Sequence, residues 1–261
     1  MRITDFTLRK NKKKITMLTC YDYAAAKLIA NTSADCLLVG DSVAMVVHGH
    51  PHTTFATLDM MRLHTEAVAR GKGSQLLIVD LPFLMHRGSL DVTINAVKTL
   101  FTAGAEVIKI EGGDPHTCSV ITHLVQAGIP VIGHIGLMPQ FIHQLGGYRI
   151  QGKAQEQATL LLAQAKALEA AGCRALVLEC IPEALAEAIT KTLSIATVGI
   201  GAGPHTDGQV LVWHDLLGLH ADITPKFIKQ YANTKSHIEM AIEQFVEDVT
   251  THRFPGPEHV Y

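Results

Sequence analysis

The sequence has few aromatic residues and no strong excess of either charge. Phe, Trp and Tyr make up 5% of its 261 residues, and 22 Lys and Arg stand against 24 Asp and Glu. A nucleic-acid-binding protein normally carries a basic face, often with aromatic side chains for base stacking. The one basic cluster, at residues 9–14, is typical of a solvated turn. We therefore expect no nucleic-acid partner.

Long apolar runs and paired cysteines are missing as well. No run approaches the roughly 18 apolar residues of a membrane-spanning helix, and no N-terminal segment has the pattern of a signal peptide. The five cysteines form no C-x-x-C pair, and three of them lie inside apolar runs. Such cysteines are typical of small buried hydrophobic residues in a reducing compartment. We expect a cytoplasmic protein with no membrane partner and no catalytic thiol.

The sequence does have a repeated alternation of short apolar runs with longer amphipathic stretches. Eight runs have strand character, the last less clearly than the others: residues 15–22, 36–41, 75–82, 106–113, 129–136, 174–182, 195–203 and 209–215. Helical patterns lie between most of them, most clearly at residues 57–70, 89–104 and 155–172. Near-continuous apolar strands alternating with helices indicate a parallel sheet that is covered on its outer face. The pattern predicts an α/β fold, a (β/α)8 TIM barrel, with a doubly wound open sheet as the alternative.

The sequence shows no linker and no second domain. We predict a single barrel domain over residues 1–261, with a C-terminal helical extension at about 223–261. Two helical stretches are expected in this extension, and residues 225–232, PKFIKQYA, open the first. The barrel does not need them, so they would suit a contact between subunits.

Charged residues stand at the ends of several of these apolar strands. In a barrel, the carboxyl ends of the strands line the active site. Alternation along the fourth strand places Lys109 and Glu111 on the same face as Val107, which we predict to be the barrel interior. In the sixth strand, Glu179 shares its face with Val177.

Carboxylates end three consecutive strands of the predicted barrel. Asp41 closes the second strand, Asp80 the third and Glu111 the fourth, while His134 ends the fifth. Each acid alone would be interpreted as a helix cap or a turn residue, and Lys109 with Glu111 as an ion pair. Together the three acids favour a site for a hard divalent cation such as Mg²⁺, which needs only one or two direct carboxylates.

Other motifs give weaker patterns. His48, His50 and His52 alternate in a predicted loop over the strand ends, which does not fix the geometry of a zinc or copper site. GIGAG, at residues 199–203, lacks the spacing of a dinucleotide-binding motif. Its glycines suit a backbone that passes close to a ligand.

Ordered blocks of the sequence resemble the ketopantoate hydroxymethyltransferase family. They are TCYDYAAAKL, LLVGDS, HTEAVARG, DLPF, AGAEVIKIEGG, VIGHIGLMPQ, GGYRIQGK, ALEAAG, LVLECIP and GIGAGPHTDGQVLVWHDLLG. The resemblance implies a (β/α)8 barrel, one Mg²⁺ per subunit, and assembly into large homo-oligomers, often decamers. Ala44 stands where the family pattern leads us to expect a glycine, and His48 and His52 lie outside the pattern. These departures concern the loop and not the chemistry.

The resemblance also implies a set of ligand contacts. Asp41 and Asp80 match the two direct metal ligands, which also border the substrate, and Glu111 matches an acid that reaches the metal through water. Ser42 and Lys109 match residues that hold the carboxylate of a keto acid.

The reaction implied by the resemblance passes through an enolate that Mg²⁺ stabilises. Glu179 matches the proposed general base, and His134 matches a histidine of the substrate pocket. The implied reaction transfers a hydroxymethyl group from 5,10-methylenetetrahydrofolate to 3-methyl-2-oxobutanoate. It gives 2-dehydropantoate and tetrahydrofolate, the first committed step of pantothenate biosynthesis. Tyr148 and Phe83 are the candidates for stacking on the folate.

Two alternatives remain open from the sequence. A metal-dependent keto-acid lyase or mutase on the same barrel would share the enolate chemistry without folate, but it would lack the GGYRIQGK and GIGAGPHTDGQ blocks. A non-catalytic metabolite-binding protein would use the strand-end charges only to hold a ligand, and the presence of Glu179 with the other acids argues against it.

Overall fold

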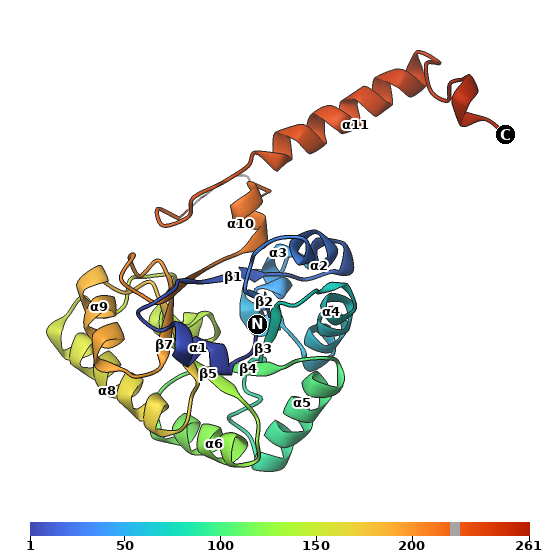
Figure 1. The fold of residues 1–261 in the computed structure, drawn as a ribbon. Helices are drawn as coiled ribbons and strands as arrows, with labels where there is room; N and C mark the ends of the chain where they lie inside the picture. The colour runs from blue at the N-terminus through green and yellow to red at the C-terminus, as the bar shows by residue number, and fades with distance from the viewer. Residues whose placement is uncertain (220–224) are drawn as a thin grey trace. The chain divides into compact units, whose positions relative to one another are not determined.

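The computed structural model describes residues 1–219 and 225–261, and its first unit, Met1–Leu211, contains a closed barrel of eight parallel strands (Figure 1). The strands are β1 (Ile15–Thr19), β2 (Cys36–Val39), β3 (Leu76–Asp80), β4 (Val107–Glu111), β5 (Val131–Gly136), β6 (Ala175–Glu179), β7 (Ala196–Ile200) and β8 (Gly208–Leu211). They pair in chain order, and β8 closes on β1. The predicted (β/α)8 barrel is confirmed, and each of the eight predicted runs overlaps one strand.

Helices connect most of the strands and cover the outside of the barrel (Figure 1). The longer ones are α2 (Tyr23–Ala30), α4 (Leu58–Gly71), α5 (Leu90–Thr102), α6 (Pro115–Gln126), α8 (Gln155–Ala170) and α9 (Glu183–Thr192). The shorter ones are α1 (Thr4–Arg9), α3 (Val43–Val46) and α7 (Ile142–Leu145), with 3₁₀ turns η1 (Thr53–Phe55) and η2 (Pro139–Phe141). The local sequence explains how helices begin: at α6, the Asp114 carboxylate accepts hydrogen bonds from the first-turn N–H groups, and Pro115 suits the first helical position.

The interior of the barrel is filled by the inward side chains of the strands. Val107 and Val177 belong to this buried cluster, and Phe6 of α1 joins it. Because residues two apart on a strand share a face, Lys109 and Glu111 continue the inward row of Val107. The predicted direction of the strand-end charges is therefore confirmed. The three cysteines in apolar runs, Cys20, Cys36 and Cys180, are buried as predicted, and Cys173 is buried as well.

The strand register brings the charged residues side by side. Asp80 of β3 pairs with Lys109 of β4, and Glu111 of β4 pairs with His134 of β5. Glu179 of β6 pairs with Gly136 of β5. The charged side chains therefore follow one another from strand to strand along one edge of the barrel.

Gly136 permits a close approach between β5 and the end of β6. Its φ of +99° lies in the region that favours glycine, and an added Cβ would stand 2.2 Å from the backbone oxygen of Glu179. That same oxygen accepts a hydrogen bond from the N–H of Leu137 at 2.8 Å. A side chain at position 136 would displace the backbone of Glu179.

We expect Gly136→Ala to lower the free energy of unfolding by more than the backbone conformation alone explains. An L-residue in the left-handed region costs about 1–2 kcal/mol, and the clash with Glu179 adds to this cost. Gly128→Ala is the matched control, because Gly128 has a φ of +89° and open space around the added Cβ. Urea unfolding of both variants measures the difference. If both variants lose the same free energy of unfolding, the clash with Glu179 does not contribute to the destabilisation.

The second unit, Val212–Tyr261, contains α10 (Trp213–Leu217), α11 (Thr234–Thr250) and the 3₁₀ turn η3 (Pro257–His259). Residues 225–232 form turns and irregular chain, so the prediction of a helix there is wrong. The N–H of Tyr231 donates to the oxygen of Leu216, a distant residue, instead of to the preceding turn. The predicted start of the extension near residue 223 lies outside the described residues.

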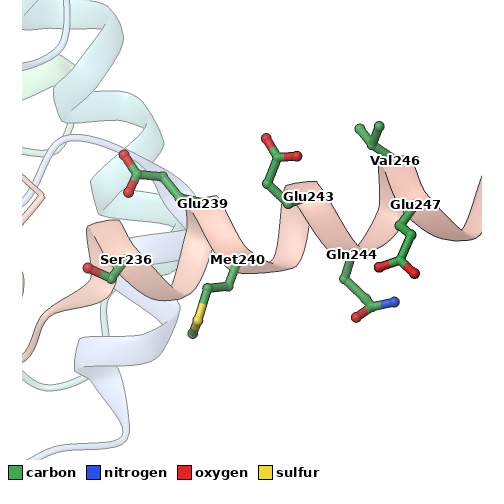
Figure 2. Close-up of a pocket in the computed structure, with 7 residues that line it drawn as sticks. All are labelled: Ser236, Glu239, Met240, Glu243, Gln244, Val246 and Glu247. Carbon is green, nitrogen blue, oxygen red and sulfur yellow. The ribbon is translucent and has the colours of Figure 1, made fainter.

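α11 carries an apolar stripe and acidic neighbours. Its stripe recurs at helical spacing and is 42–56% exposed: Ile238, Ile242, Phe245 and Val249. Figure 2 shows Glu239 and Glu243 pointing to one side of the helix and Met240 and Gln244 to another. The shallow pocket in that view is lined by α11 alone.

Of the helices described, none has the length and apolar character to cross a membrane.

Candidate active site

Three buried carboxylates and a buried lysine meet at the carboxyl ends of β2, β3 and β4. Lys109 Nζ lies 3.1 Å from Asp80 Oδ1 and 4.0 Å from Glu111 Oε1. Asp41 follows β2 after one glycine, and its backbone N–H donates to Asp80 Oδ2 at 3.0 Å. All four residues are at most 5% exposed. The structure therefore brings together the acids that were predicted from separate strands.

Gln140, which sequence reasoning missed, connects two of these acids. Its Nε2 donates to Asp41 Oδ2 at 2.8 Å and to the backbone oxygen of Leu81 at 3.0 Å. Its backbone N–H donates to Glu111 Oε2 at 3.1 Å. Gln140 is a neutral amide in the short 3₁₀ turn η2 after β5, and so short an element leaves no periodic pattern in the sequence. The one hint in the sequence was its place at the end of the VIGHIGLMPQ block.

The electrostatics of this cluster show an excess of negative charge. Burial raises the pKa of Asp41, and the neighbouring Asp80 and Glu111 raise it further. Burial also raises the pKa of Asp80, although Lys109 opposes the effect. Burial would lower the pKa of Lys109, but the surrounding carboxylates hold it above its usual range. Asp41, Asp80 and Glu111 thus repel one another in a buried site, a repulsion that a bound cation would relieve.

The oxygen atoms of the cluster fit Mg²⁺. Asp80 Oδ1 and Glu111 Oε1 are buried, and each faces the Lys109 ammonium, at 3.1 and 4.0 Å. Within residues 1–219 and 225–261, no three His, Cys, Asp or Glu side chains converge so that all could ligate one ion. Mg²⁺ does not require such a cage, because it keeps several waters and binds through one or two carboxylates. Buried oxygen donors with excess negative charge meet this requirement.

His134 lies between the acid cluster and Glu179. Its Nδ1 lies 3.4 Å from Glu111 Oε1, and its Nε2 lies 3.3 Å from Glu179 Oε2. Burial and Lys109 would lower the pKa of His134, but the two carboxylates outweigh them and raise it to about 9. Although burial opposes it, His134 in turn holds the pKa of Glu111 below its usual range. The Glu179 side chain is 16% exposed, against 2% for Glu111 and His134, so it is the acid most open to a ligand.

Two tyrosines and a serine border the cluster. Ser42, at the start of α3, has its hydroxyl 2.9 Å from the hydroxyl of the buried Tyr21. The Tyr148 hydroxyl donates to Met45 Sδ at 3.4 Å. Partial burial, together with the charges of Glu179, Asp41 and Glu111, raises the pKa of Tyr148.

The alternating histidines lie in a loop between α3 and η1, as predicted. His48 Nε2 lies 2.9 Å from His64 Nε2, on α4. The ring of His52 packs edge-on against His143, with centroids 5.0 Å apart. The histidines of this loop therefore contact rings from other parts of the chain.

Comparison with known proteins identifies the relatives of the chain. The model of the ketopantoate hydroxymethyltransferase family matches residues 1–257. A 3-methyl-2-oxobutanoate hydroxymethyltransferase of Legionella pneumophila (strain Corby) is 59% identical over 262 residues, covering 100% of both chains. One of Coxiella burnetii (strain CbuG_Q212) is 49% identical over 263 residues, covering 100% of this chain and 99% of the relative. The chain belongs to the ketopantoate hydroxymethyltransferase family. Its predicted membership and its nature as an enzyme of this hydroxymethyltransferase class are confirmed.

Two solved structures with a similar fold are of enzymes that carry other names. 2,3-Dimethylmalate lyase, a PEP mutase/isocitrate lyase superfamily member, aligns with a TM-score of 0.61 at 18% identity, covering 97% of this chain and 89% of its own. Phosphonopyruvate hydrolase in complex with oxalate and Mg²⁺ aligns with a TM-score of 0.63 at 13% identity, covering 99% and 93%. At these identities the likeness shows a shared fold alone. Membership of the ketopantoate hydroxymethyltransferase family therefore decides against the lyase and the non-catalytic alternatives.

Proposed function

We propose that the protein transfers a hydroxymethyl group from 5,10-methylenetetrahydrofolate to 3-methyl-2-oxobutanoate, the first committed step of pantothenate biosynthesis. The observation that carries the proposal is the place of Glu179, a partly open carboxylate 3.3 Å from His134, beside the buried acid cluster. This arrangement puts a base next to a site for a chelating keto acid. The folate methylene supplies the new carbon and water supplies the hydroxyl oxygen. 2-Dehydropantoate and tetrahydrofolate leave as products.

The proposal assigns the metal contacts to the acid cluster. Asp41 and Asp80 would hold Mg²⁺ directly, and Glu111 would reach it through water, as expected for an ion that retains part of its hydration shell. When bound, Mg²⁺ would act as a Lewis acid that polarises the keto-acid carbonyl and stabilises negative charge on it. The excess of buried acid over Lys109 supports a cation here. The phosphonopyruvate hydrolase with a similar barrel was solved with oxalate and Mg²⁺.

The chain's own residues prepare the keto acid for attack. Glu179 takes the proton from C3 of 3-methyl-2-oxobutanoate, and the electron pair left at C3 forms the new bond to the folate methylene carbon. Both C–N bonds of that methylene break, and water supplies the hydroxyl group. The proton from C3 and one proton from water go to the two folate nitrogens. His134, held between Glu111 and Glu179, keeps the base in place. Lys109 offsets the charge of the substrate carboxylate, and Ser42 offers it a hydroxyl. A positioned base of this kind contributes about 10²–10⁴-fold to a rate.

One assay tests the proposed reaction. Purified protein is supplied with 3-methyl-2-oxobutanoate and 5,10-methylenetetrahydrofolate, and loss of the folate is followed with and without Mg²⁺. Loss that depends on both Mg²⁺ and the keto acid supports the proposal. Exchange of the C3 hydrogen with solvent but no folate consumption would reject folate as the donor and retain the enolate chemistry.

Lys109→Met is expected to raise the KM for 3-methyl-2-oxobutanoate by about 10–100-fold. A hydrogen bond to a charged group is worth about 1.5–3 kcal/mol, and each 1.4 kcal/mol is a factor of ten. Steady-state kinetics with the keto acid varied measures the change. Lys98→Met, on the exposed face of α5, is the matched control.

Because Lys109 also forms an ion pair with Asp80, its role could instead be to stabilise the fold. Removing one partner of a buried ion pair typically destabilises a protein by about 3–5 kcal/mol. If Lys109→Met has a lower melting temperature but the wild-type KM, Lys109 stabilises the fold and does not bind the substrate.

We also propose that the protein is a cytoplasmic homo-oligomer, a decamer, in which each chain is a single barrel domain with a C-terminal extension. The resemblance to the family implies the assembly. Support comes from the exposed apolar stripe of α11, at Ile238, Ile242, Phe245 and Val249, which a second copy of the chain would cover. Mass measurement of the native protein tests the stoichiometry.

A further inference from the structure

We infer that a pocket between the loops following β3 and β5 binds the pterin ring of the folate substrate. The inference rests on the proposed function and adds to it a place for the second substrate. The pocket has a volume of about 400 Å³, within the range of small-molecule sites. Its main lining residues are Phe83, Leu84, His86, Arg87, Gln140 and Phe141.

The pocket adjoins the acid cluster. Both of its loops leave the carboxyl ends of their strands, the edge of a barrel where substrates bind. Gln140 lines the pocket and also donates to Asp41 Oδ2 at 2.8 Å. A ligand in the pocket would therefore lie one side chain away from the proposed keto-acid site.

Two buried polar groups of the pocket have unused hydrogen-bonding capacity. His86 is 1% exposed, and neither of its ring nitrogens has a hydrogen-bond partner among the described residues. Gln140 Oε1 is likewise buried and unpartnered there, although the Nε2 of the same amide makes two bonds. Buried polar groups are nearly always hydrogen-bonded in native proteins. Such groups lining a pocket point to a ligand that completes them.

The chemistry of these groups selects the class of ligand. Burial lowers the pKa of His86 to about 4, so at neutral pH its ring offers one N–H donor and one acceptor nitrogen. Gln140 Oε1 is an acceptor and needs an N–H group. 3-Methyl-2-oxobutanoate has only acceptor oxygens, whereas a pterin edge carries amino and N–H donors beside ring-nitrogen acceptors.

The walls of the pocket suit a flat ring. Phe83 and Phe141 are half-buried, one on each loop. The Arg87 guanidinium lies 5.5 Å from the centroid of the Phe141 ring, and two hydrogen bonds to Asp114, at 2.6 and 2.9 Å, hold it there. Leu84 is 52% exposed with a φ of +63°. A bulky residue in this left-handed conformation is an outlier, and such outliers cluster at ligand sites.

Binding of 5-formyltetrahydrofolate, a stable folate, tests the inference by calorimetry on the full-length protein. His86→Leu and Phe141→Leu are each expected to weaken binding about tenfold, the size expected when a buried partner or an aromatic contact is lost. The KM for 5,10-methylenetetrahydrofolate should rise by a similar factor, and the KM for the keto acid by much less. The matched controls are His123→Leu and Phe101→Leu, in a separate pocket between α5 and α6.

The outcomes separate this inference from the proposed function. Wild-type folate affinity in both pocket variants overturns the inference, provided that wild-type protein consumes 5,10-methylenetetrahydrofolate. Wild-type protein that exchanges the C3 hydrogen but neither binds nor consumes folate overturns the donor and the pocket together. Thermal melting verifies that each variant is folded. Phe83→Leu, on the half-buried wall, replaces any variant that is not, with the same expected loss.

Discussion

Glu179→Gln should slow the exchange of the C3 hydrogen of 3-methyl-2-oxobutanoate with D₂O by about 10²–10⁴-fold, the usual contribution of a general base. Turnover with folate should fall by the same factor, because both processes need the same proton removed. Glutamine keeps the shape of the side chain and removes its basicity. Binding of Mg²⁺ and of the keto acid should therefore persist.

The exchange is measured by proton NMR of the C3–H signal in D₂O containing Mg²⁺, with and without folate. Glu183→Gln, on the exposed first turn of α9, is the matched control. If Glu179→Gln exchanged the proton as fast as wild type, the base would lie elsewhere. His134, whose Nε2 is 3.3 Å from Glu179 Oε2, would then be the next candidate.

Asp80→Ala is expected to remove most of the activity and to weaken Mg²⁺ binding by more than about 100-fold. Loss of an outer partner of a metal ligand costs about 10–100-fold, so loss of a direct ligand should cost more. Asp80 also accepts from the N–H of Asp41 and pairs with Lys109, so its removal disturbs both neighbours. Asp41→Ala should have a similar effect. Glu111→Gln should weaken metal binding less, because we propose that water separates that acid from the ion.

Calorimetric titration with Mg²⁺ measures these affinities. A ligand that binds only the folded state raises the melting temperature, so Mg²⁺ should stabilise the wild type and leave Asp80→Ala nearly unchanged. Asp59→Ala is the control, because that side chain on α4 is 85% exposed. Wild-type affinity in Asp80→Ala would contradict the metal assignment.

The eight strands and the direction of their charges could be predicted because the information is local. A barrel strand is buried on both faces and reads as a continuous apolar run, and the period of two then assigns Lys109, Glu111 and Glu179 to the interior. The strand order followed from the general rules of the fold. The resemblance added the roles of these residues, which no pattern of residues alone could supply.

The remaining features depend on contacts between distant segments. His86 lies in a turn after β3 and Gln140 in the short 3₁₀ turn after β5, and their importance appears only when these two connections meet. Ser42 pairs with Tyr21, a contact between the ends of two strands that no spacing predicts. The sequence predicted a helix at residues 225–232. The backbone N–H of Tyr231 instead donates to the backbone oxygen of Leu216, so it cannot donate to the preceding turn of a helix.

The site is divided between the two halves of the chain. The acid cluster with Lys109 belongs to β2, β3 and β4, whereas His134 and Glu179 belong to β5 and β6. A polypeptide that stopped after β4 would retain the carboxylates proposed to hold the ion but not the proposed base, and one that began at β5 would retain the proposed base without them. With the proposed roles, proton exchange at C3 should therefore require both half-barrels in one assembled ring. If the two half-barrels were expressed from separate genes, exchange of the C3 hydrogen would show whether the fragments assemble.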